Sequence, residues 1–64
     1  MTQETEGRTY CLKFRDLNTN YVWYGTVDYT KAVAENAASR LNIQYAGTEV
    51  KAVPITEREQ ANHE

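Results

Sequence analysis

Two neighbouring stretches near the start of the chain alternate apolar or aromatic residues with polar ones. Residues 8–17 and 20–28 are rich in aromatic and β-branched types, and Asn18-Thr19 between them favours a turn. The pattern therefore predicts a β-hairpin with a two-residue loop, in which one face is mostly apolar and the other mixed. The pairing sets Phe14 opposite Trp23, Leu12 opposite Gly25 and Tyr10 opposite Val27, and it turns Cys11, Lys13, Arg15, Val22, Tyr24 and Thr26 to the mixed face.

The hydrophobic period changes after Asp28. Apolar residues then recur at three- and four-residue steps, which predicts an amphipathic helix with Thr30 as its N-cap. Gly47 is a suitable end for it, and Asn42 is an earlier alternative. Small alanines line its apolar face, so we expect the helix to lie close over the bulky face of the hairpin and to cover Trp23. The residues of this face are Val33, Ala34, Ala37, Ala38, Leu41 and Tyr45.

Residues 49–55 read as a third strand, with Pro54 tolerated near its end. The predicted fold is α+β, a three-stranded antiparallel sheet packed on one helix in the order β-β-α-β. The chain of 64 residues allows one domain, placed at residues 8–55. Residues 1–7 and 56–64 lack apolar periodicity, and we expect them to be flexible tails, the second one acidic.

Charge and cysteine content narrow the class of protein. Seven Lys and Arg against nine Asp and Glu give a net charge of −2, with a weakly basic body between acidic ends. This mild balance disfavours a general nucleic-acid coating protein. No apolar run approaches the roughly 18 residues that span a membrane. The lone Cys11 excludes a disulfide framework and indicates a reducing compartment, so we expect a cytoplasmic protein.

Residues suited to catalysis are almost absent. His63 lies next to the end of the chain, and Cys11 has no histidine in the predicted domain to activate it. One Cys and one His cannot build a zinc site, and the three glycines form no phosphate-binding loop. We therefore expect no enzyme activity, no catalytic residue, no metal and no cofactor.

Two surfaces remain for binding. The open face of the sheet carries Lys13 and Arg15 beside Tyr24, a mixture that could contact phosphates or stack on bases, or could simply be a solvated face. The second surface is an unpaired strand edge, which could accept a partner's strand or be protected by charge and Pro54.

The layout of residues 10–55 resembles the small podophage inhibitors of bacterial RNA polymerase. Tyr10, Phe14 and Tyr21 fall where apolar or aromatic residues recur in that family, and residues 46–53, Ala-Gly-Thr-Glu-Val-Lys-Ala-Val, are similar to its entry into the third strand. The family's paired arginines on the third strand correspond to Ala52 and Pro54, which is a departure.

The resemblance implies a phage-type protein that acts in the bacterial host cytoplasm by occluding the DNA channel of the polymerase against its large subunits. It makes Asp28, Glu35 and Glu49 candidates for an acidic strip facing the DNA path. Lys13, Arg15 and Lys51 are the candidate contacts to the polymerase.

Residues 23–30 read Trp-Tyr-Gly-Thr-Val-Asp-Tyr-Thr and are followed by several alanines. This segment resembles the connection from sheet to helix in AP2-like and integrase arm-type DNA-binding modules. Those modules place a sheet face in the major groove, which makes DNA binding the alternative function. A dimeric structural module is the third possibility, and the sequence leaves the oligomeric state open.

Overall fold

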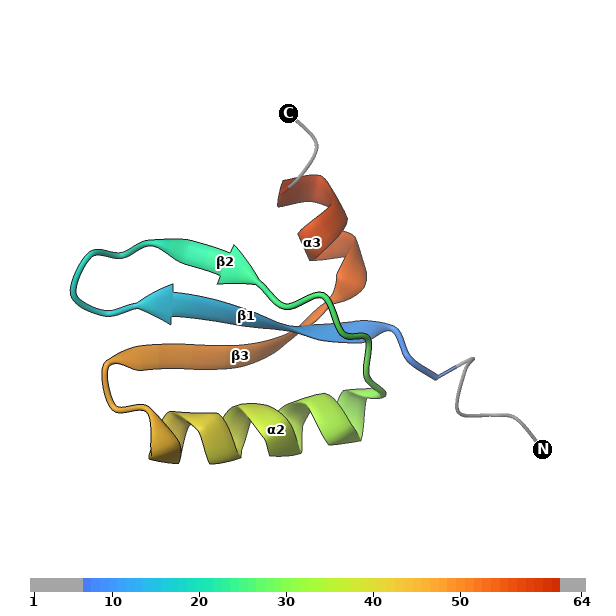
Figure 1. Ribbon diagram of the computed structural model, residues 1–64. Coiled ribbons are helices and arrows are strands. Elements are labelled where there is room, and N and C mark those ends of the chain that lie inside the picture. The colour runs from blue at the N-terminus through green and yellow to red at the C-terminus, as the bar shows by residue number, and fades with distance from the viewer. Residues whose placement is uncertain (1–6, 62–64) are drawn as a thin grey trace.

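The computed structural model describes residues 7–61 and contains one antiparallel sheet and two helices. The sheet has the strand order β2-β1-β3, with β1 in the centre (Figure 1). The predicted α+β class and three-stranded antiparallel sheet are confirmed, and a second helix follows the third strand. The elements are β1 (Tyr10–Asp16), β2 (Val22–Tyr24), α2 (Lys31–Gln44), β3 (Thr48–Pro54) and α3 (Ile55–Ala61).

The predicted register of the hairpin is confirmed near its loop. Phe14 pairs with Trp23, and the amide of Gly25 donates to the carbonyl of Leu12 at 2.9 Å. The loop is longer than predicted because β1 ends at Asp16, whose carboxylate accepts the amides of the next residues, Asn18 at 2.8 Å and Thr19 at 3.2 Å. An Asx turn of this kind replaces the tight two-residue connection without changing the register.

The register predicted farther from the loop is wrong. Tyr10 pairs with Tyr29 rather than Val27, and Val27 is 55% exposed. The chain leaves the ladder after Gly25 because Arg58 of α3 holds the Gly25 carbonyl and the Asp28 carboxylate, each at 2.9 Å. β2 is consequently only three residues long.

The core lies between α2 and the β1–β3 half of the sheet. Leu12, Ala34, Ala38 and Val50 form its buried cluster, so the predicted alanine face of the helix is confirmed at Ala34 and Ala38. The helix begins as predicted, since the hydroxyl of Thr30 accepts the amide of Val33 at 3.3 Å. Around this cluster pack the partly buried Tyr10, Phe14, Tyr29, Ala37, Leu41 and Ala52.

The predicted cover over Trp23 is wrong. In Figure 1, α2 runs alongside β3, on the side of the sheet away from β2, and the Trp23 side chain is 38% exposed. The order of the strands explains the difference. β3 pairs with the side of β1 opposite to β2, and α2, which comes directly before β3 in the chain, lies beside β3. One short helix cannot cover three strands.

The outer edge of β3 is closed by a side chain of α2. The Asn42 amide donates to the carbonyl of Val50 and accepts its amide, both at 2.8 Å. These are the two bonds that a neighbouring strand would make, so Asn42 stands in for a fourth strand at this position. Pro54, which has no amide hydrogen, ends the same strand as predicted.

The C-terminal segment differs from the predicted tail. Residues 56–61 belong to α3, which packs on the sheet face opposite α2 and contacts both β1 and β3. The amide of Ile55 donates to the carbonyl of Thr9 at 2.9 Å and so fixes the start of the helix. Residues 1–6 and 62–64 lie outside the described residues, and Gly7 is exposed.

Candidate functional site

Four charged side chains gather on the part of the sheet face that α3 does not cover. Lys13 and Arg15 of β1 lie directly opposite Lys51 and Glu49 of β3, because alternate residues of paired strands share a face. Together they line a shallow hollow of about 190 Å³. We call Lys13, Arg15, Glu49 and Lys51, with Glu57 of α3, the charged face.

Arg15 and Glu49 form the centre of the charged face. The guanidinium donates to Oε1 of Glu49 from Nε at 3.0 Å and from Nη2 at 2.7 Å, and from Nη1 to Oδ1 of Asn20 at 3.0 Å. The hydrogen bonds from Arg15 lower the pKa of Glu49, and the Lys51 ammonium, 3.9 Å from the other carboxylate oxygen, lowers it further. Glu49 therefore stays ionised and fixes the position of the Arg15 guanidinium through two hydrogen bonds.

A second group joins the charged face to α3. Glu57 lies 3.2 Å from the Lys13 ammonium and accepts a 3.0 Å hydrogen bond from the Tyr24 hydroxyl. Burial would raise the pKa of Glu57, but the hydrogen bonds from Lys13 and Tyr24 outweigh it and lower the value. The same contact raises the pKa of Lys13, whereas burial and the bond to Glu57 raise that of Tyr24.

Lys51 is the most available charge on this face. Its side chain is 64% exposed, and its nearest carboxylate, Glu49, is already occupied by Arg15. Its contact with Glu49, at 3.9 Å, is the longest ion pair on this face, so a partner's acidic group would separate less at Lys51 than at Lys13 or Arg15, whose pairs measure 3.2 and 2.7 Å.

The structure gathers only some of the residues that the sequence singled out. Lys13, Arg15, Glu49 and Lys51 come together, but the predicted acidic strip of Asp28, Glu35 and Glu49 does not form. Glu49 lies at the loop end of the sheet, and Asp28 follows the opposite end, where it pairs with Arg58. Glu35 is exposed on α2.

Two contact residues were missed because they were assigned to a tail. Glu57 binds Lys13 and Tyr24, and the mostly buried guanidinium of Arg58 binds the chain between β2 and α2. Composition carried a usable signal, since residues 57–61 read Glu-Arg-Glu-Gln-Ala, all good helix formers.

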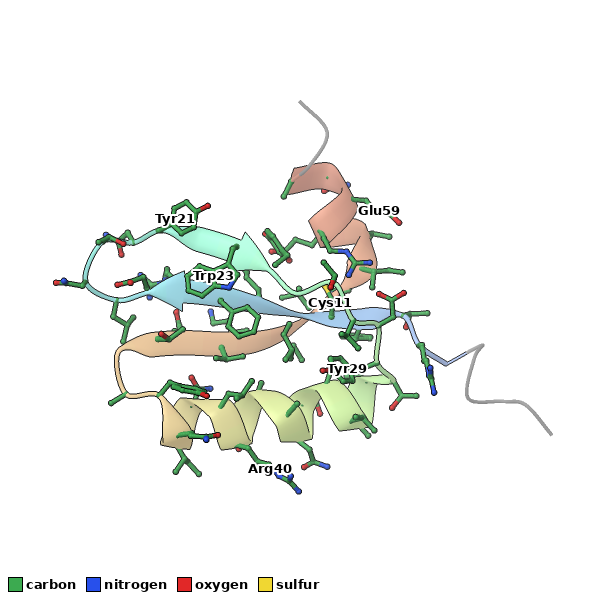
Figure 2. All side chains as sticks on the ribbon, viewed as in Figure 1. Cys11, Tyr21, Trp23, Tyr29, Arg40 and Glu59 are labelled. Carbon is green, nitrogen blue, oxygen red and sulfur yellow. The ribbon has the colours of Figure 1, made fainter. Side chains whose placement is uncertain are left out.

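An aromatic ladder occupies the other face at the open edge of the sheet. The rings of Phe14 and Trp23 stack with centroids 5.3 Å apart and an interplanar angle of 4°, and Tyr21 stacks on Trp23 at 5.8 Å and 26°. Figure 2 shows Trp23 on β2 and Tyr21 just before it, away from Arg40 on α2. Tyr21 is 66% exposed, so the outermost ring faces solvent.

Cys11, which the sequence pattern placed on the mixed face of the hairpin, is fully buried, at 0% exposure, near the start of α3 (Figure 2). Burial raises its pKa, which disfavours the reactive thiolate. Within residues 7–61, no group of three or more His, Cys, Asp or Glu side chains is placed to hold a metal ion. No helix in that range is long and apolar enough to cross a membrane.

Comparisons of the chain with protein-family models, with curated proteins and with solved structures found no match.

Proposed function

We propose that this protein binds and inhibits a host macromolecular machine, with bacterial RNA polymerase as the first candidate, by occupying its DNA channel without chemistry. The observation that supports this proposal is the charged face. Four of the six candidate residues, drawn from two strands far apart in sequence, line one hollow on a rigid sheet. Fixed charges on a rigid element suit recognition by electrostatic complementarity.

The geometry changes which residues carry the interaction. The acids in the resemblance-based model are dispersed, so occlusion rests on the charged face, and Asp28 and Glu35 have no part in it. Lys51 is the first contact because it is the most exposed cation of the hollow. Glu49 presents a carboxylate at the same place, and a polymerase surface that fits the face must offer both signs of charge.

Promoter-dependent transcription by purified bacterial RNA polymerase tests the proposal. Runoff product should decrease as the protein is added, and Lys51→Glu should weaken inhibition about tenfold, the effect of one rim or partly buried charge pair. Lys31→Glu, the same charge reversal on exposed α2, is the matched control and should inhibit like the unchanged protein. Full transcription at saturating protein would contradict the proposal.

A mobility-shift assay with duplex DNA distinguishes DNA binding from polymerase binding. Lys13 and Arg15, the cations a DNA-binding sheet would use, are each paired with a carboxylate, Glu57 and Glu49. Duplex DNA should therefore show no mobility shift at low salt with the protein alone. A shift that weakens steeply as salt rises would favour the DNA-binding alternative and overturn inhibition by polymerase contact.

A further inference from the structure

The two edges of the sheet are treated differently by the sequence. The β3 edge is closed by Asn42 and ends in Pro54. The β2 edge carries Tyr21-Val22-Trp23-Tyr24, with neither charge nor proline, in a chain of which 25% of the residues are charged. Exposed strand edges are normally blunted by charge, proline or a covering element. β2 has neither charge nor proline of its own, and this is typical of an edge that serves as a contact surface.

The register shows which backbone groups are available there. Backbone hydrogen bonds join Asp16 to Tyr21 and Leu12 to Gly25. In an antiparallel ladder every second residue is hydrogen-bonded, so on this side Tyr21, Trp23 and Gly25 bond to β1. Val22 and Tyr24 therefore direct their amide and carbonyl groups away from β1. A hollow of about 350 Å³ follows this edge, between β2 and the Arg58 and Ala61 side chains of α3.

We infer that the occupant is a second copy of this chain, joined through antiparallel pairing of the two β2 strands. A two-fold axis beside Trp23 pairs Val22 of each copy with Tyr24 of the other, using all four outward backbone groups on each side. Trp23 then lies opposite Trp23 in a non-hydrogen-bonded pair, where side chains approach most closely and aromatic pairs are favourable. Tyr21 lies opposite Gly25, which has no side chain to obstruct its ring.

The features of one copy fit this arrangement. α2 covers β3 and β1 but leaves the Trp23 and Tyr21 rings of the aromatic ladder exposed. Pairing along β2 produces one six-stranded sheet whose uncovered middle is filled by the ladders of both copies. The charged face points to the opposite side of the sheet at Arg15 and Glu49, so it remains available for a target.

The available area sets the expected strength. Tyr21 and Trp23 are 66% and 38% exposed, so together they offer roughly 200 Å² of aromatic surface. Stable interfaces bury about 800 Å² on each partner. The backbone of the β2 edge and the hollow beside α3 add further buried area, yet the total stays at the low end of the range for stable interfaces. The dimer should therefore form in the micromolar range and dissociate on dilution.

Sedimentation equilibrium from about 1 µM to about 1 mM tests the inference. The mass should rise from 7.4 kDa toward twice that value as concentration increases. N-methylation of the Val22 amide by chemical synthesis, which leaves the β1–β2 bonds intact, should raise the dissociation constant at least about tenfold. Tyr21→Glu should do the same, by placing like charges at the interface.

Tyr45→Glu is the matched control, because Tyr45 is an exposed tyrosine at the end of α2, far from β2. It should dimerise like the unchanged protein. Circular dichroism and the fluorescence spectrum of Trp23, whose ring stacks on Phe14, verify that each variant is folded. A single-chain mass over the whole range overturns the inference. So does a dimer that survives both β2 changes, or one that Tyr45→Glu disrupts equally.

Discussion

Trp23 lies flat against Phe14, its partner across the β1–β2 pair, with ring centroids 5.3 Å apart and planes within 4° of parallel. Because Trp23 is 38% exposed and only Phe14 of the pair packs against the core cluster, the stacking contact adds to the backbone hydrogen bonds that hold the short strand β2 to β1. An offset aromatic pair contributes about 0.5–1.5 kcal/mol beyond the area it buries.

Trp23→Ala should therefore lower the free energy of unfolding by about 1–2 kcal/mol, less than the loss expected for a fully buried tryptophan. Trp23→Phe keeps a stacked ring and should recover about half of that loss. Urea unfolding followed by circular dichroism at low protein concentration measures both. A loss of more than about 4 kcal/mol would mean that Trp23 belongs to the core.

The Asn42 side chain offers a second test. Asn42→Ala leaves the amide and carbonyl of Val50 without partners at the edge of β3, which should destabilise the fold by about 1–3 kcal/mol. Asn36→Ala on the exposed side of α2 is the control, since it makes the same change in helix propensity without touching the sheet. It should be neutral or slightly stabilising in urea unfolding. Equal effects of the two changes would contradict the edge-closing role.

Arg58 should control access to Cys11. Its guanidinium joins α3 to the Gly25 carbonyl and to Asp28, and Cys11 lies buried near the start of that helix. Arg58→Ala should loosen α3 and speed the reaction of Cys11 with a thiol reagent about tenfold or more, in line with a local opening made easier by about 1.4 kcal/mol. Gln60→Ala, an exposed change in the same helix, should leave the rate unchanged. An unchanged rate in Arg58→Ala would contradict the clamp.

The attachment of α3 should also depend on pH. The pKa of Glu57 is lowered in the folded protein, so its contribution is fully present above the ordinary value of 4.5 and disappears as the pH falls through the lowered value. The pKa of Lys13 is raised, so its contribution is present below 10.5 and disappears only as the pH rises through its raised value. Stability from this pair should be constant across neutral pH and fall in acid.

Glu57→Gln isolates that effect from the other carboxylates. The difference in urea midpoint between the unchanged protein and Glu57→Gln should be largest at neutral pH and shrink below about pH 4.5. Glu59→Gln, on the exposed side of α3, should show little difference at any pH. A Glu57→Gln difference that does not change with pH would show that the ion pair contributes nothing.

Local sequence patterns predicted the fold correctly wherever the position of a residue depends on residues close to it in the chain. Alternation gave the correct pairing of Phe14 with Trp23, and the alanine spacing gave the buried side of α2, with Thr30 as its cap. Sheet order was not accessible in this way, because it depends on which side of β1 the third strand enters. That choice alone decides whether α2 covers Trp23.

The candidate site was predictable to the same extent. Strand alternation placed Lys13 and Arg15 on one face, and pairing with β3 brought Glu49 and Lys51 to them. Arg58 was missed because its partners Asp28 and Gly25 lie 30 and 33 residues away in the chain, a relation that no short pattern records. The same contact draws residues 26–28 out of the ladder, which explains why Val27 was misplaced.

Closure of one sheet edge by Asn42 limits how large an assembly can become. A sheet with two open margins is a template that recruits strand after strand, the route to fibres. Here only the β2 margin can recruit, and two molecules that meet there present Asn42 at both outer ends. Growth then stops at a pair, because Asn42 and Pro54 stand at both outer margins of the joined sheet.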